Sequence, residues 1–439
     1  MSFTTTLLQW FSENGRSLPW RETRDPYAIW LSEVILQQTR IEQGRPYWER
    51  FMRRWPTVEA LAAATEDDVL REWQGLGYYS RARNLHTAAR QIVANGGFPT
   101  TYEEIRKLKG VGDYTAAAIG SFAFSLPIAV VDGNVYRVLS RYFGIDTPIN
   151  TTQGKKEFAA LAQSLIQTTE PFVTHSTLPT PHWPSALAAP SVPHSTFHTP
   201  HSSLHIPHSS LYNQAIMDFG ATQCTPQSPR CAECPLMETC SAFREQRVNE
   251  LPVKLKTLKV KERHFTYIYI RYQDETAIRR RPAGDIWQGL YEPLNFEIDN
   301  LKFEVCDYLC SLMSNTESKQ LEVCDYLCSL MSNTESKQLR SHCSNHKCQT
   351  SNFKLQILAS QVKHVLTHRI IMADFYLWQP DERPTLPDGY FWIKEQDIDR
   401  YAVPRLVEIL LETLSHSPSL PLGEVGGGSH QSPKHETNL

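Results

Sequence analysis

The sequence predicts a mostly α-helical N-terminal domain followed by a smaller α+β domain. Apolar residues recur every three or four positions through most of residues 1–170, which is the spacing of amphipathic helices. From residue 264 onward the pattern alternates with a period of two, which is typical of β-strands. A length of 439 residues agrees with two or three domains of about 150 residues each.

The N-terminal domain, which we place at 1–242, shows helical periodicity between turns that contain glycine or proline. Helices are expected at 28–39, 44–54, 66–73, 80–94, 115–123, 134–143, 155–168 and 211–220. The last two flank a tract, 171–210, that lacks Asp, Glu, Lys and Arg and is rich in Pro, Ser, Thr and His. Because proline interrupts helices and central strands, we expect an inserted disordered loop there. Metal binding by its histidines is a weaker alternative.

The C-terminal half begins with a basic linker at 243–263 and continues as the α+β domain at 264–415, with a disordered tail at 416–439. Strands are expected at 264–270, after a turn at 273–275, and at 353–359 and 369–378, with a closing helix at 404–414. Residues 304–321 recur identically at 322–339. We interpret this tandem duplication as a copied apolar helix, although its cysteines four residues apart leave a metal site as an alternative.

Composition limits the class of protein. The net charge of −3 excludes a basic field over the whole molecule, so a nucleic acid has to be bound by a local patch. No apolar run approaches the ~20 residues that span a bilayer, and the N-terminus lacks the pattern of a signal peptide. We therefore expect a soluble cytoplasmic protein, with no membrane partner, whose ten cysteines are thiols or metal ligands.

Four cysteines form the strongest motif. Their spacing is C-x6-C-x2-C-x5-C, and they are Cys224, Cys231, Cys234 and Cys240. Four thiolates in so short a segment can surround one iron–sulfur cubane. A structural zinc ion is the main alternative, because zinc also accepts tetrahedral sulfur ligation.

A glycine-rich turn precedes the predicted helix at 115–123. Gly110, Val111 and Gly112 lie in LKGVGDYTAAAI, where backbone N–H groups can bind a phosphate without reading sequence. An ordinary loop is the alternative.

Asp132, in VVDGNVYRVL, lies at the start of the next helix and is an N-cap candidate. The helix dipole and backbone donors are expected to keep its carboxylate ionised, as stabilisation of a sugar cation requires.

Glu33 lies among apolar residues in WLSEVILQQT. Partial burial would raise its pKa and keep it protonated near neutral pH, as a general acid requires. An exposed helical Glu is the alternative. Glu33 and Asp132 then have opposite predicted ionisation, which suits cleavage of a glycosidic bond by one acid and one anion.

Six segments in order resemble the adenine DNA glycosylases of the MutY type, within the endonuclease III (helix-hairpin-helix) superfamily. They are LSEVILQQT, GLGYYSRARN, LKGVGDYTAAAI, VDGNVYRVL, YNQAIMDFGA and the cysteine loop. The resemblance is close over 1–170 and 211–263 and looser over 264–415, which resembles the family's Nudix-like domain. It implies base-excision repair, one [4Fe–4S] cluster on the four cysteines, and double-stranded DNA with an A:8-oxoguanine or A:G mispair as partner. We further expect a monomer in the cytoplasm, associated with the nucleoid.

The same resemblance implies the roles of individual residues. Glu33 would protonate the adenine at N7, and Asp132 would stabilise the sugar cation. Tyr114 occupies the place where bifunctional relatives carry a Schiff-base lysine, and a phenol cannot form an imine, so β-lyase activity should be absent or slight. The adenine pocket and substrate contacts would involve Arg16, Leu18, Trp20 and Asn134. Trp20 is equally a core candidate.

Two further segments resemble DNA-reading parts of the family. Gln38 and Tyr78 match the wedge that enters the base stack opposite the extruded adenine, where new stacking and hydrogen bonds offset unstacking. Tyr78 is also a core candidate, and Arg81 and Arg83 beside it are expected to meet phosphates. Thr367 and His368 align with the segment that senses 8-oxoguanine. The carboxylate-rich Nudix box is missing, so no Mg²⁺ cage is expected.

Two other functions remain open at this point. One is a bifunctional, endonuclease III-like lyase for damaged pyrimidines, against which Tyr114 and the C-terminal domain argue. The other is a catalytically impaired protein that only binds DNA lesions, which the insert at 171–210 and the duplication at 304–339 leave possible.

Overall fold

The computed structural model describes residues 2–167, 208–255, 260–298 and 355–416. The chain divides into two compact units, Met1–Thr257 and Leu258–Leu439. The boundary lies inside the segment predicted as a linker, 243–263. The duplication at 304–339, nearly all of the tract at 171–210 and the tail after residue 416 lie outside the described residues.

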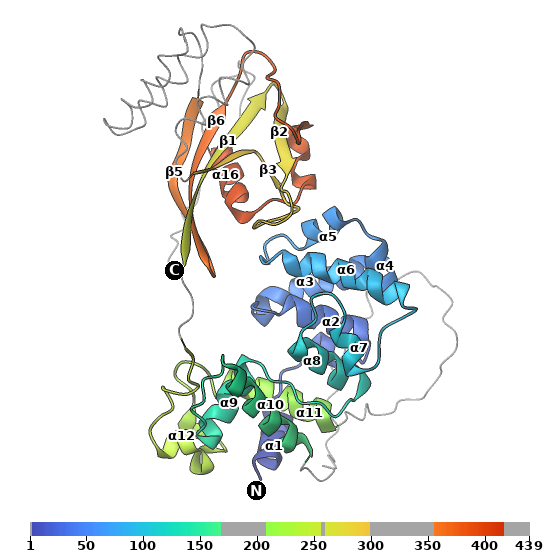
Figure 1. Ribbon diagram of the computed structural model, residues 1–439, viewed down its shortest axis with the longest axis vertical. Coiled ribbons are helices and arrows are strands. Elements are labelled where there is room, and N and C mark those ends of the chain that lie inside the picture. Colours follow the sequence, from blue (N-terminus) through green and yellow to red (C-terminus); the bar gives the residue numbers. More distant parts are fainter. Residues whose placement is uncertain (1, 168–207, 256–259, 299–354, 417–439) are drawn as a thin grey trace, which may run out of the picture. The chain divides into compact units, whose positions relative to one another are not determined.

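The N-terminal unit is helical (Figure 1). Its α-helices are α1 (Phe3–Asn14), α2 (Pro26–Ile35), α3 (Ile41–Arg54), α4 (Val58–Ala63), α5 (Glu66–Glu72), α6 (Ser80–Ala94), α7 (Tyr102–Arg106), α8 (Asp113–Phe124), α9 (Gly133–Phe143), α10 (Thr152–Gln167), α11 (His208–Asp218) and α12 (Ser241–Arg244). Shorter helical turns are η1 (Pro19–Arg21), η2 (Phe219–Gln223), η3 (Cys231–Glu233) and η4 (Met237–Thr239).

Local sequence accounts for many of these helix starts. Hydroxyl side chains cap α4, α5 and α7, where Thr57, Thr65 and Thr101 each accept a hydrogen bond from a first-turn N–H. The periodicity did not predict α1, α4 or α7, because short or terminal helices carry few repeats. The limit of the tract at 171–210 was also wrong: α11 begins at His208, and Ser209 and Ser210 are buried.

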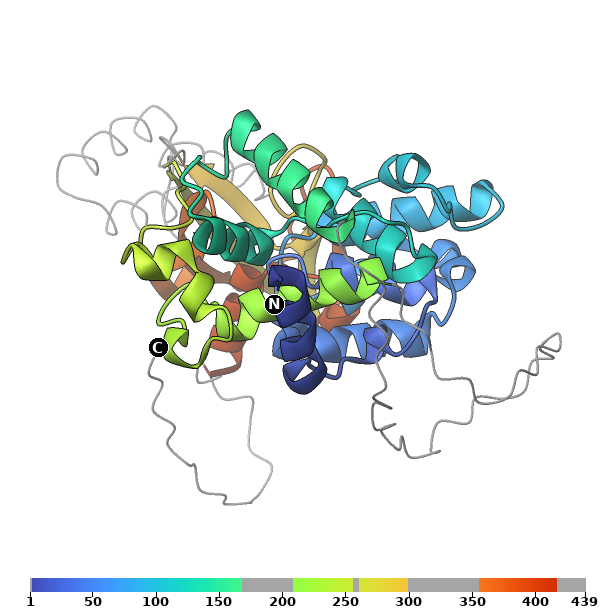
Figure 2. The ribbon, with the colours of Figure 1, turned by 90° about the horizontal axis from the view of Figure 1, so that it is seen from below.

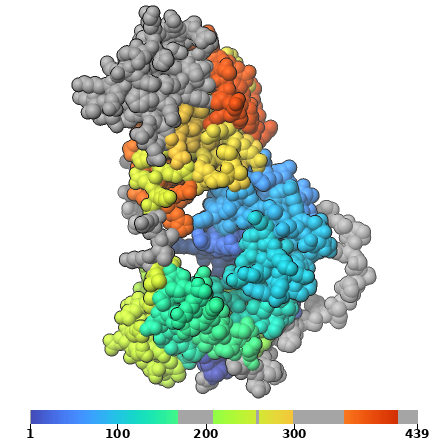
Figure 3. Space-filling view, viewed as in Figure 1, coloured from blue at the N-terminus to red at the C-terminus, as the bar shows by residue number. Residues whose placement is uncertain are grey.

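The helices of this unit fall into two groups (Figures 1 and 3). Helices α2–α8 form the blue-to-cyan group, and α9–α12 form the green-to-yellow-green group, which α1 joins by contacting α11 (Figure 2). Helix α8 connects the groups, because it contacts both α2 and α11. The residues predicted to carry the chemistry lie on α2 and α8 and at the start of α9, where the groups meet.

The C-terminal unit is a mixed sheet closed by a helix (Figure 1). Its strands are β1 (Lys261–Tyr272), β2 (Glu275–Arg280), β3 (Tyr291–Glu292), β4 (Leu294–Ile298), β5 (Leu355–Leu366), β6 (Arg369–Trp378) and β7 (Tyr390–Lys394). The order is β3-β2-β1-β6-β5, with β4 paired to β1 and β7 to β2. Only β1 and β6 pair in parallel among these. The turn η5 (Glu395–Arg400) leads to α16 (Arg405–His416).

One face of this sheet carries the core. Phe265, Tyr267 and Phe375 alternate on the central strands and pack with Leu406 and Leu410 of α16. Burial alternates along β6 with the period of two from which the strands were predicted, whereas residues 265–270 of β1 are all buried. Strand β1 begins at Lys261, so the predicted linker is shorter at its C-terminal end than its sequence indicates. Among the described helices, none is both long and apolar enough to cross a bilayer.

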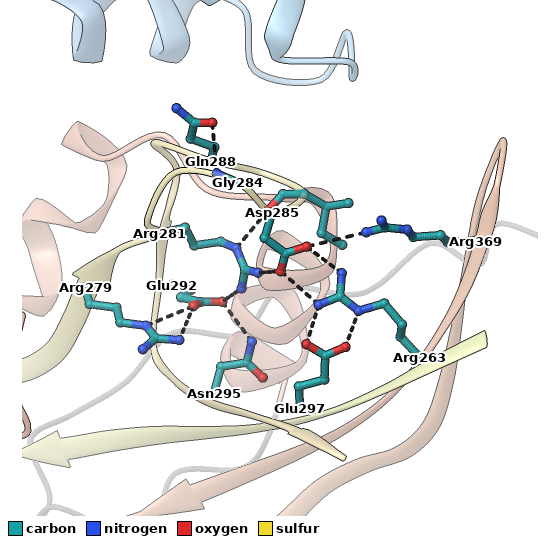
Figure 4. Close-up of polar contacts among 11 residues, drawn as sticks. Arg263, Arg279, Arg281, Gly284, Asp285, Gln288, Glu292, Asn295, Glu297 and Arg369 are labelled. Carbon is teal, nitrogen blue, oxygen red and sulfur yellow. Dashed lines mark hydrogen bonds and ion pairs between the residues drawn. The ribbon is translucent and has the colours of Figure 1, made fainter. Parts of the chain in front are cut away.

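An ion-pair network holds the segment between β2 and β3 (Figure 4). Buried Arg281 binds both Glu292, which is fully buried, and Asp285. Asp285 also pairs with Arg263 and, at 3.4 Å, with Arg369 at the start of β6. Burial favours the neutral form of Asp285, but hydrogen bonds from Arg263 and the charge of Arg281 outweigh it and lower the pKa of that carboxyl. The network thus ties this segment to the first residue of β6.

Candidate active site

Glu33 and Tyr114 form the centre of the site. Glu33 lies on α2 and is 8% exposed, so the alternative of a solvated helical Glu is wrong. Tyr114, on the first turn of α8, donates a hydrogen bond from its hydroxyl to Oε2 of Glu33 at 2.8 Å. Two helices that are 81 residues apart in sequence therefore meet at one carboxyl group.

Burial raises the pKa of Glu33 to about 7. The hydrogen bond from Tyr114 opposes that rise, the negative charge of Asp132 adds to it, and the charge of Arg21 lowers it. Burial and the charge of Glu33 raise the pKa of Tyr114 well above its usual value. Tyr114 is therefore a phenol at neutral pH and can only donate to Glu33, whose own proton is exchangeable in that pH range.

Asp132 is the N-cap of α9, as predicted. Its Oδ1 accepts the N–H groups of Asn134 and Val135 at 2.9 and 2.8 Å, and its Oδ2 accepts the Asn134 amide at 2.8 Å. The predicted contrast with Glu33 in the direction of the pKa shift is wrong, because burial raises the pKa of Asp132 as well, against the opposing effect of these donors. The two carboxyl groups therefore shift in the same direction. Within the part of the chain that the structure describes, they differ in their donors, which are three on Asp132 and one on Glu33.

Asn134 is held between Asp132 and Arg137. Arg137 donates to the Asn134 amide oxygen at 2.8 Å and to the Gly220 carbonyl. A Cβ at Gly220 would lie 2.6 Å from the Asn134 Cβ, so only glycine allows η2 to approach the first turn of α9 this closely. Asn134, predicted as a substrate contact, thus orients the carboxylate of Asp132.

The segment predicted to form the adenine pocket is anchored by Asp218. Arg16 donates its backbone N–H and its guanidinium to the Asp218 carboxylate. Leu18 and Trp20 are 5% and 7% exposed, and the Trp20 ring packs edge-on against Trp48 at 5.6 Å. Both side chains are therefore part of the core of the helical unit.

Arg21 and Asp218 were missed by the sequence analysis. Arg21 forms two hydrogen bonds of 2.8 Å to the fully buried Asp218 carboxylate. Burial alone would raise the pKa of Asp218, but the hydrogen bonds of Arg21 and Arg16 hold it at about 2. The motif YNQAIMDFGA, which contains Asp218, was recognised in the sequence. No local pattern, however, could show that Asp218 binds an arginine 197 residues away.

The residues of the predicted wedge lie in two turns. Gln38 follows α2 and Tyr78 precedes α6, and both have positive φ values, 55° and 46°. Tyr78 is 46% exposed, so it is not a core residue. Arg81 does not face phosphates as predicted, because it is 8% exposed and donates to backbone carbonyls of both turns.

The glycine-rich turn lies between α7 and α8, in a helix–turn–helix arrangement. Gly110 has φ +78°, and a Cβ there would lie 2.6 Å from the Asn84 Cβ, so the position requires glycine. The prediction that Val111 offers its N–H to a phosphate is wrong, because that group donates to the Leu108 carbonyl at 3.1 Å. Gly110 and Gly112 are exposed on this turn.

The four cysteines line one cavity, together with Arg141. Arg141 donates to the Cys224 sulfur at 3.4 Å. Burial and the neighbouring sulfurs raise the pKa of Cys234 to about 12, so a positively charged centre is needed to hold these sulfurs as thiolates. Iron supplies that charge, and the arginine suits a cluster whose net charge is negative. The chemistry of the four sulfur donors therefore suits an iron–sulfur cluster, although within the described residues they are not gathered into a preformed metal site.

Thr367 and His368 form the exposed turn between β5 and β6. The His368 carbonyl accepts the N–H of Lys261 at 3.1 Å, which ties this turn to the start of β1. The next residue, Arg369, reaches Asp285 in the network of Figure 4.

Comparisons with known proteins agree with these features. Residues 31–167 match the HhH-GPD superfamily of base excision DNA repair proteins, residues 224–240 match the iron–sulfur binding domain of endonuclease III, and residues 266–413 match a NUDIX domain. The adenine DNA glycosylase of Buchnera aphidicola (subspecies Schizaphis graminum) is 32% identical over 320 residues, which are 72% of this chain and 80% of that protein. The chain belongs to the adenine DNA glycosylase family.

Other relatives differ in coverage. The human adenine DNA glycosylase is 36% identical over 260 residues, which are 57% of this chain and 40% of that protein. A thermostable thymine-DNA glycosylase of known structure is 26% identical, with a TM-score of 0.44 over 55% of this chain and 95% of that one.

Family membership settles the alternatives for the cysteines and for the fold. The cysteine loop is the site of a [4Fe–4S] cluster, so the zinc alternative is set aside. The helical unit is a base-excision DNA glycosylase domain of the helix-hairpin-helix superfamily, and the C-terminal unit is Nudix-like. The protein is thus a DNA repair enzyme with an iron–sulfur centre.

Proposed function

We propose that this glycosylase hydrolyses the N-glycosidic bond of adenine that is mispaired with 8-oxoguanine or guanine in duplex DNA. The buried pair of Glu33 and Tyr114, beside the capping carboxylate Asp132, carries this proposal. It supplies one protonated acid and one anion, which is what cleavage of a glycosidic bond needs.

In the proposed reaction, Glu33 gives its proton to N7 of the extruded adenine. The C1′–N9 bond then breaks and its electron pair leaves with the base. The three hydrogen bonds to Asp132 favour its ionised form, and its carboxylate stabilises the cationic sugar. Water adds to C1′ and releases a proton, which restores protonated Glu33 over the cycle. With Tyr114 in the site in place of a lysine, no Schiff base forms.

The iron–sulfur cluster takes no part in this reaction. The four cysteines would hold it, and it would act as a rigid, charged cross-link between η2, η3 and η4. Arg137 connects this region to the active site, since it donates to the Cys224 carbonyl at 2.7 Å and to Asn134 beside Asp132.

Replacement of Glu33 by Gln tests the acid. The amide keeps the shape of the side chain but has no acidic proton, so excision should fall at least ~10²–10⁴-fold while DNA binding stays intact. Single-turnover excision and binding to the same mispaired duplex would be measured side by side. Near-normal excision by Glu33→Gln would refute the role of Glu33 as the general acid. It would favour either another acid in the site or the lyase mechanism of the endonuclease III-like alternative.

Recognition of the opposite base is assigned to the turn between β5 and β6. It presents two polar side chains, Thr367 and His368, on the surface of the Nudix-like unit. The lesion differs from guanine only at its oxidised edge, so a sensor has to pair with that edge through hydrogen bonds. The alternative is that both side chains only satisfy backbone groups of the turn.

The double variant Thr367→Ala, His368→Ala separates these possibilities. It should remove about 1 kcal/mol of lesion readout for each lost hydrogen bond. Excision and affinity would be measured on duplexes with adenine opposite 8-oxoguanine and opposite guanine. The loss should fall on the 8-oxoguanine duplex; equal weakening of both duplexes would show that the turn has only a structural role.

We also propose that the protein acts as a monomer on nucleoid DNA in the cytoplasm, and that Gln38 and Tyr78 enter the base stack opposite the extruded adenine. The exposed ring of Tyr78 supports the second proposal. Aromatic and amide groups suit an opened stack, where they replace lost base contacts.

A further inference from the structure

Arg81 lies in the first turn of α6 and turns inward. One guanidinium nitrogen, Nη1, donates to the carbonyls of Val34, Ile35 and Gln37, the first two at 3.1 and 2.9 Å. The other, Nη2, donates to the carbonyls of Leu76 and Gly77 at 3.1 and 3.3 Å. A single side chain therefore joins the end of α2, the turn that contains Gln38, and the turn that contains Tyr78.

The partners of Arg81 are dipoles rather than charges. Within the described part of the chain, the acceptors of its guanidinium are five backbone carbonyls and the Thr39 hydroxyl. Those of Val34 and Ile35 end α2, where the helix dipole concentrates negative charge. The guanidinium also stacks on the buried Trp73 ring, 5.1 Å from its centroid. Burial lowers the pKa of Arg81 to about 10, so it is still charged at neutral pH.

Both turns have backbone conformations that need support. Gln38 and Tyr78 are non-glycine residues with positive φ, which costs free energy unless the surroundings impose it. Arg81 binds the carbonyl of the residue before each of them, Gln37 and Gly77. Its donors thus lie where they can fix both strained residues at once.

We propose that Arg81 is a positioning residue that sets Gln38 and Tyr78 relative to each other and to the helix that carries Glu33. Through these contacts, Gln38 and Tyr78 enter the base stack at the correct position relative to Glu33, the acid that protonates the extruded adenine. The inference rests on the proposed wedge function of Gln38 and Tyr78.

Arginine is needed because its planar fork has donors on two separated nitrogens. Lysine keeps the charge and the length, but all its donors lie on one nitrogen, so it can bind one turn and not both. Arg81→Lys is therefore the informative change. Arg90→Lys is the matched control, because Arg90 is exposed on the same helix and, within the described residues, donates to the Ala62 carbonyl at 3.3 Å rather than to either turn.

The experiment measures single-turnover excision on two duplexes with each protein. In one duplex adenine faces guanine, and in the other it faces an abasic analogue, so that no pair has to be opened. The ratio of the two rates is independent of the fraction of protein that folded. Arg81→Lys should lower the paired-to-unpaired ratio about tenfold or more, because misplaced groups lose reactive geometry steeply. Arg90→Lys should leave it unchanged.

Tyr78→Ala, measured in parallel, separates the inference from the function on which it rests. If Tyr78→Ala lowers the ratio and Arg81→Lys does not, the positioning role of Arg81 is wrong and the wedge stands. If Tyr78→Ala leaves the ratio unchanged, the wedge is wrong and the inference falls with it. Should Arg81→Lys fail to accumulate, Arg81→Gln, which keeps two donors on one nitrogen, takes its place with the same expectation.

Discussion

The proton on Glu33 is controlled by opposing neighbours. Burial and the charge of Asp132 favour the neutral acid, whereas the Tyr114 hydroxyl and Arg21 favour the carboxylate. The balance sets the pKa of Glu33 at about 7. A general acid works best when its pKa is near the working pH, because a large fraction is then protonated and the proton is still transferred readily. Tyr114 thus keeps Glu33 from becoming too weak an acid.

A pH profile tests this balance. Because Glu33 acts in its protonated form, the second-order rate constant for excision, measured under single-turnover conditions, should fall as pH rises through about 7. Tyr114→Phe removes a hydrogen bond that lowers the pKa of Glu33, so this fall should move to higher pH. Rates would be measured from about pH 5 to pH 9 for both proteins. Tyr102→Phe is the control, because the hydroxyl of this partly buried tyrosine on α7 donates to Asp113. A fall at the same pH in Tyr114→Phe as in the unaltered protein would contradict the proposed coupling.

Local motifs predicted these residues unevenly. Glu33 and the capping role of Asp132 follow from segments of about ten residues, whose apolar pattern and helix starts are readable. Tyr114 was predicted only from the resemblance to the family. The pKa of Asp132 was not predictable, because the burial that raises it comes from distant segments. Arg81 was placed on the surface wrongly, since the sequence does not show which way a helical arginine points.

At the scale of elements, α11 organises both sides of the site. At its middle, Asn213 is fully buried; its amide nitrogen donates to the Ile128 carbonyl and to the Ser121 hydroxyl, and its oxygen accepts the Val130 N–H. These bonds hold the strand-like segment that ends at Asp132. At the end of α11, Asp218 holds the segment from Arg16 to Arg21. One helix therefore orients the cap and the predicted pocket.

Asp218→Asn is predicted to destabilise the protein. The substitution leaves Arg16 and Arg21 without their buried counter-charge, and removal of one partner of a buried ion pair typically costs about 3–5 kcal/mol. Urea unfolding, followed by helix content, would measure the loss. Glu49→Gln is the control, because its pair with Arg45 is exposed and contributes at most about 0.5 kcal/mol. Equal, small effects would show that the cluster does not stabilise the fold.

The elements themselves were predicted best where they are long and amphipathic. Helix α6 and strand β6 have the predicted limits, 80–94 and 369–378. Strand β5 continues to Leu366, well past its predicted end at residue 359, across a register irregularity between Ile357 and Val362. Such an irregularity breaks the period-two pattern, which is why only the first half of β5 was recognised.

The whole molecule adds relations that no local pattern contains. Strands β1 and β6 pair in parallel over Lys261–Ile270, although about a hundred residues separate them. The two units have separate cores. Their order could therefore be predicted from the change in apolar periodicity along the chain, but this central pairing could not. In the sequence, the uncharged tract at 171–210 separates α10 from α11 and reaches into the first turn of α11, and the duplication at 304–339 separates the described strands β4 and β5.

Removal of the uncharged tract should leave the enzyme intact. It has no charge to bind phosphate and too little apolar patterning for a core, so residues 171–204, replaced by a short Gly/Ser linker, are predicted to be dispensable. The deletion stops before His208 because Ser209, Ser210 and Tyr212 are buried in α11. Iron content and excision of mispaired adenine should equal those of the full chain.

A longer deletion, 171–212, removes the first turn of α11 and should lose both, because Asn213 and Asp218 would then lack a stable helix. If the shorter deletion already lost iron or activity, the tract would belong to the folded structure, and its reading as a disordered insert would be wrong.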